Sequence, residues 1–370
     1  MIDPTKILSA RFRFSSWIVG VTLLAYFCAS FCLYFQWVAP SLNGDSQVHI
    51  GADSATYIGF AESLRSGRPD PLVIAALSTF PNTLWSPVLI ALVLKSTFAM
   101  VVANYVAFIA AILLLKKSFS FSMSGFLMLM LLNATTTVSL LSVNKEIIDL
   151  LVVSIFLFGY RRHRTSVILL ALFLALLNRF ELALVMLLFL AAQSSFNPLR
   201  RRRVATLVVL TLVLSVMLPL VASQNLANRF EEASAGGVVV VLDGLEMHYL
   251  FAVSVIPKVA ENFFGMLVNP SSWGAFSESL DIANSYVLVS NNLATLFVVI
   301  VLASRRSFTT RSEIMYFAFF GCIIMSISLV IQPRYFYFVY VLLCLQAAHP
   351  KRSRSAVGVP SDHQLEGAHG

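Results

Sequence analysis

The sequence contains few charged residues. Lys and Arg number 26 and Asp and Glu number 18, so charged residues make up only 12% of the 370 positions. A soluble domain carries about twice that fraction, and 58% of this chain is hydrophobic. A fold in water cannot cover so much apolar surface, and a disordered chain needs low hydrophobicity. The composition excludes both classes and predicts a lipid bilayer around most of the protein.

Several functional motifs are also absent from the sequence. It contains no Gly-rich phosphate loop, no His/Cys metal cluster and no G-x-S-x-G elbow. These absences argue against an ATP-driven pump, a zinc protease and a serine hydrolase. The four cysteines lie inside apolar segments, where we interpret them as small buried hydrophobes. No cofactor is predicted, and no motif supports a divalent metal.

The basic residues of the chain form short clusters at the ends of apolar runs. These clusters are Lys116–Lys117, Arg161–Arg164, Arg200–Arg203, Arg305–Arg306 and Lys351–Arg352. Such clusters are typical of the cytoplasmic loops of membrane proteins. The net charge of +8 is therefore not interpreted as a nucleic-acid-binding surface, and no nucleic acid is expected as a partner.

The apolar runs predict an all-α polytopic membrane protein with about ten transmembrane helices. Several runs are shorter than the roughly 20 residues that a straight crossing needs, so short or broken helices are expected. Residues 1–350 are expected to form a single transmembrane domain, and 351–370 a disordered cytoplasmic tail. The predicted spans are 17–39, 88–115, 121–141, 147–160, 166–177, 182–194, 204–222, 286–303, 313–331 and 334–348.

Placing every basic cluster in the cytoplasm fixes the orientation of these spans. The first span is then an uncleaved anchor, and both termini are cytoplasmic. Residues 40–87 and 223–285 become outer loops, with interfacial helices in the first loop and interfacial or re-entrant helices around 246–268. The assignment is weakest at Lys95, because a turn there would split 88–115 into two short spans and invert all later ones.

This topology places many isolated ionisable residues on the outer face. They are Asp45, Asp53, Lys145, Glu146, Arg179, Glu181, Arg229, Glu231 and Arg334. Ionisable residues at the edges of spans are costly and tend to line cavities or sites. One polar cavity open to the non-cytoplasmic side would account for all of them.

Two of the outer polar segments have alternative interpretations. Asp53 is either the N-cap of a surface helix or a carboxylate that takes a proton from an acceptor hydroxyl. The segment Asn144-Lys145-Glu146 is either a polar turn in which Glu146 caps the next helix or a site where Lys145 binds phosphate.

The other outer charges interrupt or precede apolar helices. Arg179 and Glu181 interrupt a run of about 27 apolar residues. The apolar segments on either side of them are short, which suggests half-helices that enter a cavity. Arg334 precedes Tyr335 and is either an interfacial side chain in an aromatic belt or a donor fork for phosphate. Carboxylates beside Lys and Arg on one face favour an anionic, lipid-linked substrate and a hydroxyl acceptor.

The layout and four short segments resemble the GT-C superfamily of integral membrane glycosyltransferases. The segments are Gly51–Tyr57, Trp85–Leu92, Asn144–Glu146 and Pro333–Tyr335. The resemblance implies a bacterial inner-membrane enzyme of envelope polysaccharide assembly with a periplasmic active site. Its donor would be a polyprenyl-phosphate- or pyrophosphate-linked sugar, and its acceptor a glycan or a lipid-linked sugar.

The same resemblance assigns roles to residues of this chain. It makes Asp53 the catalytic base, with Asp45 as a poorer candidate. Substrate-binding candidates are Tyr57, Lys145, Glu146, Arg179, Glu181, Arg229 and Arg334. The chain also resembles O-antigen polymerases in size, span number and outer arginines, so repeat-unit polymerisation stays open. A flippase or transporter for lipid-linked oligosaccharides is a further alternative, although no internal repeat of the kind common in transporters is visible.

Overall fold

The computed structural model describes most of the chain from Ala52 to His349. The described residues are 21, 25–26, 28–29, 32, 35–36, 52–79, 81–94, 96–143, 145–232, 244–246, 248–268, 282–327 and 333–349. Asp45, most of the expected first span 17–39 and the expected tail 351–370 lie outside this set. The helical positions of Asp53 and Arg229 are described, but their side chains are not.

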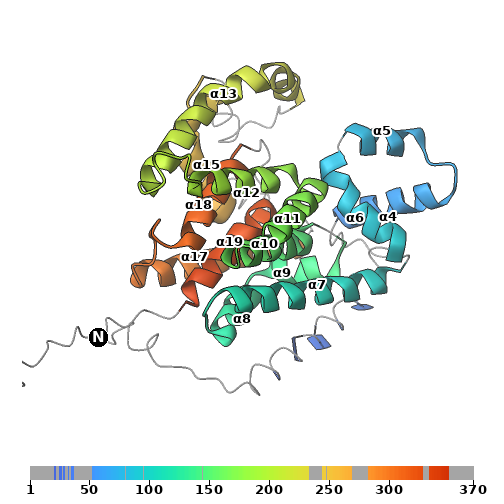
Figure 1. The fold of residues 1–370 in the computed structure, drawn as a ribbon. Coiled ribbons are helices and arrows are strands. Elements are labelled where there is room, and N and C mark those ends of the chain that lie inside the picture. The colour runs from blue at the N-terminus through green and yellow to red at the C-terminus, as the bar shows by residue number, and fades with distance from the viewer. Residues whose placement is uncertain are drawn as a thin grey trace, which may run out of the picture.

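Helices make up all the regular structure of the described residues (Figure 1). In chain order they are α4 Ala52–Arg65, α5 Pro71–Thr79, α6 Pro81–Leu94, α7 Thr97–Ser118, α8 Met123–Leu131, α9 Ala134–Leu141, α10 Glu146–Arg161, α11 Thr165–Asn178, α12 Phe180–Gln193, α13 Arg203–Glu232, α15 Phe251–Val268, α17 Ile282–Ser304, α18 Glu313–Met325, the 3-10 helix η2 Pro333–Phe336 and α19 Tyr337–Ala347. The all-helical fold is therefore confirmed for this part of the protein.

Two helical segments of the described residues are long and apolar enough to cross a membrane. They are Phe98–Ser118 in α7 and Arg203–Leu220 in α13. A third candidate is the pair α8 and α9, which is bent by 82° at its break. Five further apolar helices are shorter. These helices are compatible with insertion into a membrane, and the total of about ten spans stays a prediction.

The expected single helix over 88–115 is wrong. The chain breaks after Leu94, and Ser96 caps the next helix by accepting a hydrogen bond from the amide of Ala99. A serine side chain satisfies an amide that a helix start leaves without a partner. Helix α7 alone is long enough to cross a membrane, and α6 packs on α4 and α5. A break at Lys95 therefore does not require a second crossing that would reverse the orientation of all later spans.

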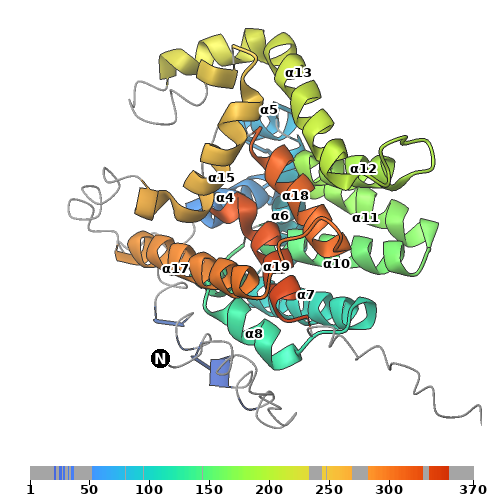
Figure 2. The same ribbon diagram turned by 90° about the vertical axis from the view of Figure 1, so that its left-hand side faces the viewer.

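Helices α10 and α19 lie in the middle of the structure. In both views they lie between α13 and the pair α7 and α8 (Figures 1 and 2). Helix α10 packs against α7, α11 and α19, while α19 also packs against α17 and α18. Aromatic rings fill the space between α10, α12 and α18, with the ring of Phe189 5.0 Å from that of Phe317 and 6.1 Å from that of Phe156. This packing holds the second half of α10, the helix whose first turn carries residues of the candidate site.

Gly321 permits the close approach of α18 and α19, and replacing it tests this packing. A Cβ atom there would lie 2.8 Å from Val339 Cγ2 and 2.9 Å from the ring of Phe338. We expect Gly321→Ala to destabilise the protein by about 1–3 kcal/mol because the added methyl overfills the contact. The matched control is Gly59→Ala, where a Cβ meets nothing within 4 Å and the change should stabilise helix α4 by about 0.5–1 kcal/mol. Thermal unfolding of the purified variants in one detergent measures both, and equal unfolding temperatures would contradict the prediction.

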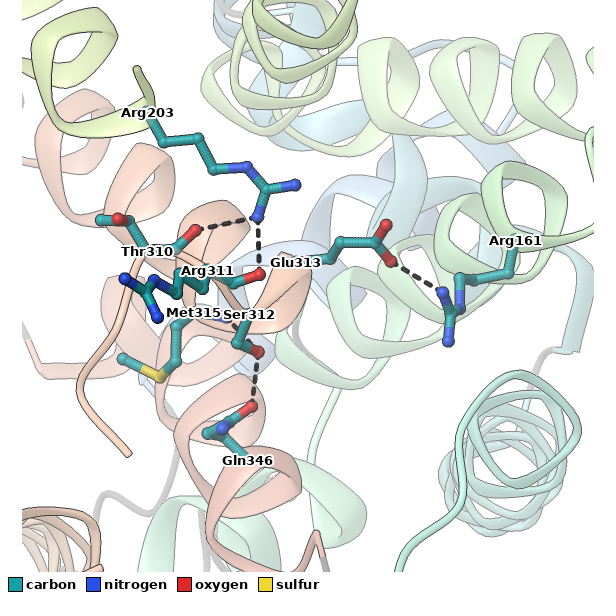
Figure 3. Close-up of polar contacts among 8 residues, drawn as sticks. All are labelled: Arg161, Arg203, Thr310, Arg311, Ser312, Glu313, Met315 and Gln346. Atoms are coloured by element: carbon teal, nitrogen blue, oxygen red, sulfur yellow. Dashed lines mark hydrogen bonds and ion pairs between the residues drawn. The ribbon is translucent and has the colours of Figure 1, made fainter. Parts of the chain in front are cut away.

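The basic turns meet at one end of the bundle, which we call the basic end (residues 116–122, 161–164, 200–203, 305–313 and 346–349). Three contacts that join these turns are Arg161–Glu313 at 2.9 Å, Arg203 to the Thr310 carbonyl at 2.8 Å and Ser312 to Gln346 at 2.7 Å (Figure 3). Two others are Arg305 to the Ala347 carbonyl at 2.5 Å and the Ser122 amide to the Ala348 carbonyl at 3.0 Å. The topology drawn from the charges requires these turns to share one side, and the structure brings them together.

Candidate functional site

A buried group of charged residues lies where α11 ends and α10 and α12 begin, away from the basic end. The apolar sequence breaks here because Arg179 adopts an extended conformation (φ −160°, ψ 112°) between the two short helices α11 and α12. The predicted break of the apolar sequence within residues 177–181 is therefore confirmed. Neither Lys145 nor Arg179 uses its side chain to cap the helix that follows it. Two helix N-termini with partial positive charge therefore face this group.

Arg179 is the centre of the group and is only 5% exposed. Its Nε lies 3.3 Å from Asp149 Oδ2, and its Nη2 lies 3.8 Å from Glu146 Oε1. Both carboxylates are buried as well. Burying three charges is costly unless they pair, so Arg179 and the two acids stabilise one another.

Asn178 connects the end of α11 to the same group. Its Nδ2 donates to Asp149 Oδ1 at 2.6 Å and to the Lys145 carbonyl at 3.4 Å. Sequence reasoning had missed Asp149 and Asn178. The signal for Asp149 was present, because it follows Glu146 by three residues and therefore shares its helix face. A second acid on that face of an apolar helix indicates a buried partner.

Tyr335 lies between two arginines. The Arg179 guanidinium lies 4.9 Å from the centre of the Tyr335 ring, and that of Arg334 lies 5.6 Å from it. Arg334 is half-buried. A contact between a cation and the face of an aromatic ring contributes about 0.5–2 kcal/mol to stability. These contacts bring the 3-10 helix η2, which carries Arg334 155 residues after Arg179 (positions 179 and 334), into the same site.

Helix α4 approaches the site from the other side. Ser54 is buried, and its hydroxyl donates to the Val143 carbonyl at 2.8 Å. The Lys145 ammonium lies 5.9 Å from the Tyr57 ring. The turn of α4 that carries Asp53 is therefore held against the chain that precedes α10.

The structure thus brings together five of the nine predicted site residues: Tyr57, Lys145, Glu146, Arg179 and Arg334. Glu181 lies half-buried in the first turn of α12. Asp45 lies outside the described residues, and so do the side chains of Asp53 and Arg229. These five residues, distant in sequence, lie near one another, and the single outer cavity stays a prediction.

The group retains binding capacity. Within the described part of the chain, Arg179 Nη1 and Asn178 Oδ1 are buried without a hydrogen-bond partner. A buried N–H without an acceptor is costly and rare. Arg179, Lys145 and Arg334 supply three positive charges, and Glu146, Asp149 and Glu181 supply three carboxylates around Arg179. An arginine N–H with helix N-termini nearby is suited to an anion such as phosphate. Among the described residues no group of three His, Cys, Asp or Glu side chains could hold a metal ion.

A second buried ion pair lies in and before α15. Lys258 is fully buried, and its Nζ lies 2.8 Å from Glu246 Oε1, which also accepts a hydrogen bond from Ser254 at 2.9 Å. Within the expected interfacial or re-entrant segment around 246–268, helix α15 packs against α13 and α17. Phe263 of α15 contacts Phe336 of η2, with ring centres 5.3 Å apart, so α15 also supports the start of α19.

Comparisons of this chain with protein-family models, with curated proteins and with solved structures found no match.

Proposed function

We propose that the protein is an integral membrane glycosyltransferase that uses a sugar linked to a lipid phosphate and belongs to the GT-C type. The observation that carries the proposal is the buried Arg179, whose Nη1 has no hydrogen-bond acceptor, in a group with Lys145 and Arg334. A lipid-linked leaving group presents phosphate oxygens at the membrane, and these are the acceptors that such a group lacks.

The proposed reaction is a displacement at the anomeric carbon of the donor sugar. The carboxylate of Asp53 takes the proton of an acceptor hydroxyl, whose oxygen then bonds to the anomeric carbon. The bond from that carbon to the phosphate oxygen breaks, and its electron pair stays on the phosphate. Arg179, Lys145 and Arg334 stabilise that developing charge. Tyr57 holds the Lys145 ammonium in place through its ring.

The proposal extends to topology and compartment. About ten spans would place the basic end in the cytoplasm, following the distribution of Lys and Arg in membrane proteins. The charged group at Arg179 would then open to the periplasmic side of a bacterial inner membrane. The substrates would be a polyprenyl-phosphate-linked sugar and a glycan acceptor, in cell-envelope polysaccharide assembly.

Reconstitution of the full chain in liposomes tests the activity. The liposomes would contain radiolabelled polyprenyl-linked sugars and lipid-linked acceptors extracted from the source organism. We expect labelled glycan and free polyprenyl phosphate to form in equal amounts. Products that grow by whole repeat units would indicate a polymerase instead. Movement of the intact donor between leaflets without release of polyprenyl phosphate would contradict glycosyl transfer and support a flippase.

Two cations of the site permit a sharper test. We expect Lys145→Gln with Arg334→Gln to raise the KM for the lipid-linked donor by at least tenfold, because a charge-assisted contact contributes about 1.5–3 kcal/mol. The matched control is Lys117→Gln with Arg164→Gln, two exposed cations of the basic end, and should leave KM unchanged. Donor titrations of both double variants measure the difference. Equal KM values would remove these two side chains from the donor site.

A further inference from the structure

A pocket of about 750 Å³ opens at the basic end of the bundle, remote from the charged group at Arg179. Its wall includes Arg201, Arg202, Arg203 and Arg311, with Val204 and Val208. The first turn of α13 forms one side, and the turn before α18 forms the other. The site proposed for glycosyl transfer makes no use of this pocket.

Arg203 holds the two sides of the pocket at a fixed separation. Its Nη1 donates to the carbonyl oxygens of Thr310 and Arg311 at 2.8 and 2.9 Å (Figure 3). Its guanidinium also lies 5.0 Å from the centre of the Tyr316 ring. These contacts order the pocket before any ligand binds, which lowers the entropic cost of binding.

The remaining arginines of the pocket are exposed. Arg201, Arg202 and Arg311 each present their side chain to the surroundings. Among the described residues, none that lines the pocket is acidic. The nearest acid along the chain, Glu313, pairs with Arg161 instead at 2.9 Å (Figure 3). The start of α13 adds the partial positive charge of a helix N-terminus. The pocket is therefore suited to a ligand with a negative charge.

The apolar part of the pocket continues along α13. Side chains four residues apart lie on one side of a helix, and such a row runs from the pocket along this helix. It comprises Val204, Val208, Leu212, Val216 and Leu220, each at least 52% exposed. This row belongs to the candidate span Arg203–Leu220, of which only 11% is buried inside the protein. A ligand here meets arginines at one end and an aliphatic surface at the other.

We propose that this pocket binds the headgroup of an anionic phospholipid whose acyl chains lie along the row of aliphatic side chains on α13. Arginine binds phosphate oxygens through paired N–H donors, and basic pockets between membrane helices recognise such headgroups. The apolar row favours a lipid over a free phosphate, because a soluble anion has no acyl chain to contact these aliphatic side chains. The inference does not depend on the proposed enzyme activity.

Native mass spectrometry of the full chain in detergent tests the proposal. The probes are dioctanoyl-phosphatidylglycerol, dioctanoyl-phosphatidylcholine and glycerol phosphate. We expect the anionic lipid to bind at least tenfold more tightly than the zwitterionic one. Equal binding of the two lipids would overturn the proposal. Displacement of the anionic lipid by glycerol phosphate at an equal concentration would show a site for a soluble anion and would also overturn it.

A pair of triple variants locates the binding. Arg201→Gln with Arg202→Gln and Arg311→Gln removes the exposed arginines and keeps Arg203, which orders the pocket. Each surface arginine contributes roughly a fivefold change in affinity for an anionic lipid, so we expect affinity to fall by at least tenfold. The control is Arg162→Gln with Arg164→Gln and Arg306→Gln, exposed arginines of the same end that do not line the pocket. It removes the same charge and should bind as the parent does. An equal loss in both would assign the effect to overall charge and overturn the site.

Discussion

Asp53→Asn should lower the rate of sugar transfer by about 10²–10⁴-fold, which is the usual contribution of a general base. An amide cannot take the proton of the acceptor hydroxyl, although it is nearly identical to the carboxylate in size. The buried contact of Ser54 with the Val143 carbonyl should still hold helix α4 in place. We therefore expect an unchanged unfolding temperature and an unchanged KM for the donor. Transfer by the reconstituted variant gives the turnover, and donor titration gives KM.

The matched control lies in the same helix. Glu62 is an exposed acid of α4, and Glu62→Gln should leave turnover as in the parent. Asp45→Asn should have a small effect, since Asp45 is the poorer candidate. If Asp53→Asn retains full turnover while Asp45→Asn is inactive, the base is Asp45. If both retain full turnover, neither acid of the first loop is the base.

Arg179→Gln should destabilise the protein by about 3–5 kcal/mol and abolish transfer. Removing the guanidinium leaves the buried carboxylates of Glu146 and Asp149 without their counter-charge. Removing one partner of a buried ion pair lowers the free energy of unfolding by this amount. Thermal unfolding in detergent measures the loss of stability. The control is Arg161→Gln, because the Arg161–Glu313 pair is partly exposed, with side chains 43% and 34% accessible. Loss of this pair should lower the free energy of unfolding by less than about 1 kcal/mol.

A triple variant separates the structural from the functional role of Arg179. Arg179→Gln combined with Glu146→Gln and Asp149→Asn removes both partner charges, so most of the lost stability should return. Transfer should stay absent, because no guanidinium is present to bind the donor phosphate. Recovery of transfer would show that Arg179 serves folding alone. Failure to recover stability would show that the two ion pairs do not cause the loss.

The helical class, the presence of helices apolar enough to cross a membrane and the meeting of the basic turns at one end could be predicted from sequence. Charge and hydropathy are averages over many residues, so one unusual side chain does not change them. The gathering of Arg179, Arg334 and Lys145 followed from the same argument. When successive spans alternate in direction, the turns that carry these three residues lie on the same side of the membrane, and this assignment does not depend on how the helices pack.

The details that sequence did not reveal depend on contacts between distant segments. The bend between α8 and α9 is one example. The amide of Ala134 donates to Ser290 Oγ at 2.9 Å, and the Thr135 hydroxyl donates to Asn291 Oδ1 at 2.9 Å. These partners lie 156 residues away along the chain, and local pattern carries no information about them. The spacing of Asp149 from Glu146 indicated a buried partner, but it did not identify Arg179 as that partner, which lies 30 residues further along the chain (positions 149 and 179).

The shortness of α11 and α12 has a consequence for the surrounding lipid. Each has 14 residues and reaches about 21 Å at 1.5 Å per residue, against roughly 30 Å of hydrocarbon. Under the proposed topology, with its basic turns at one interface, this hairpin would end about 9 Å short of the opposite headgroups. The far leaflet next to the hairpin would then dip or admit water. A carrier lipid would then meet the Arg179 guanidinium in a local depression of the bilayer, without leaving its own leaflet.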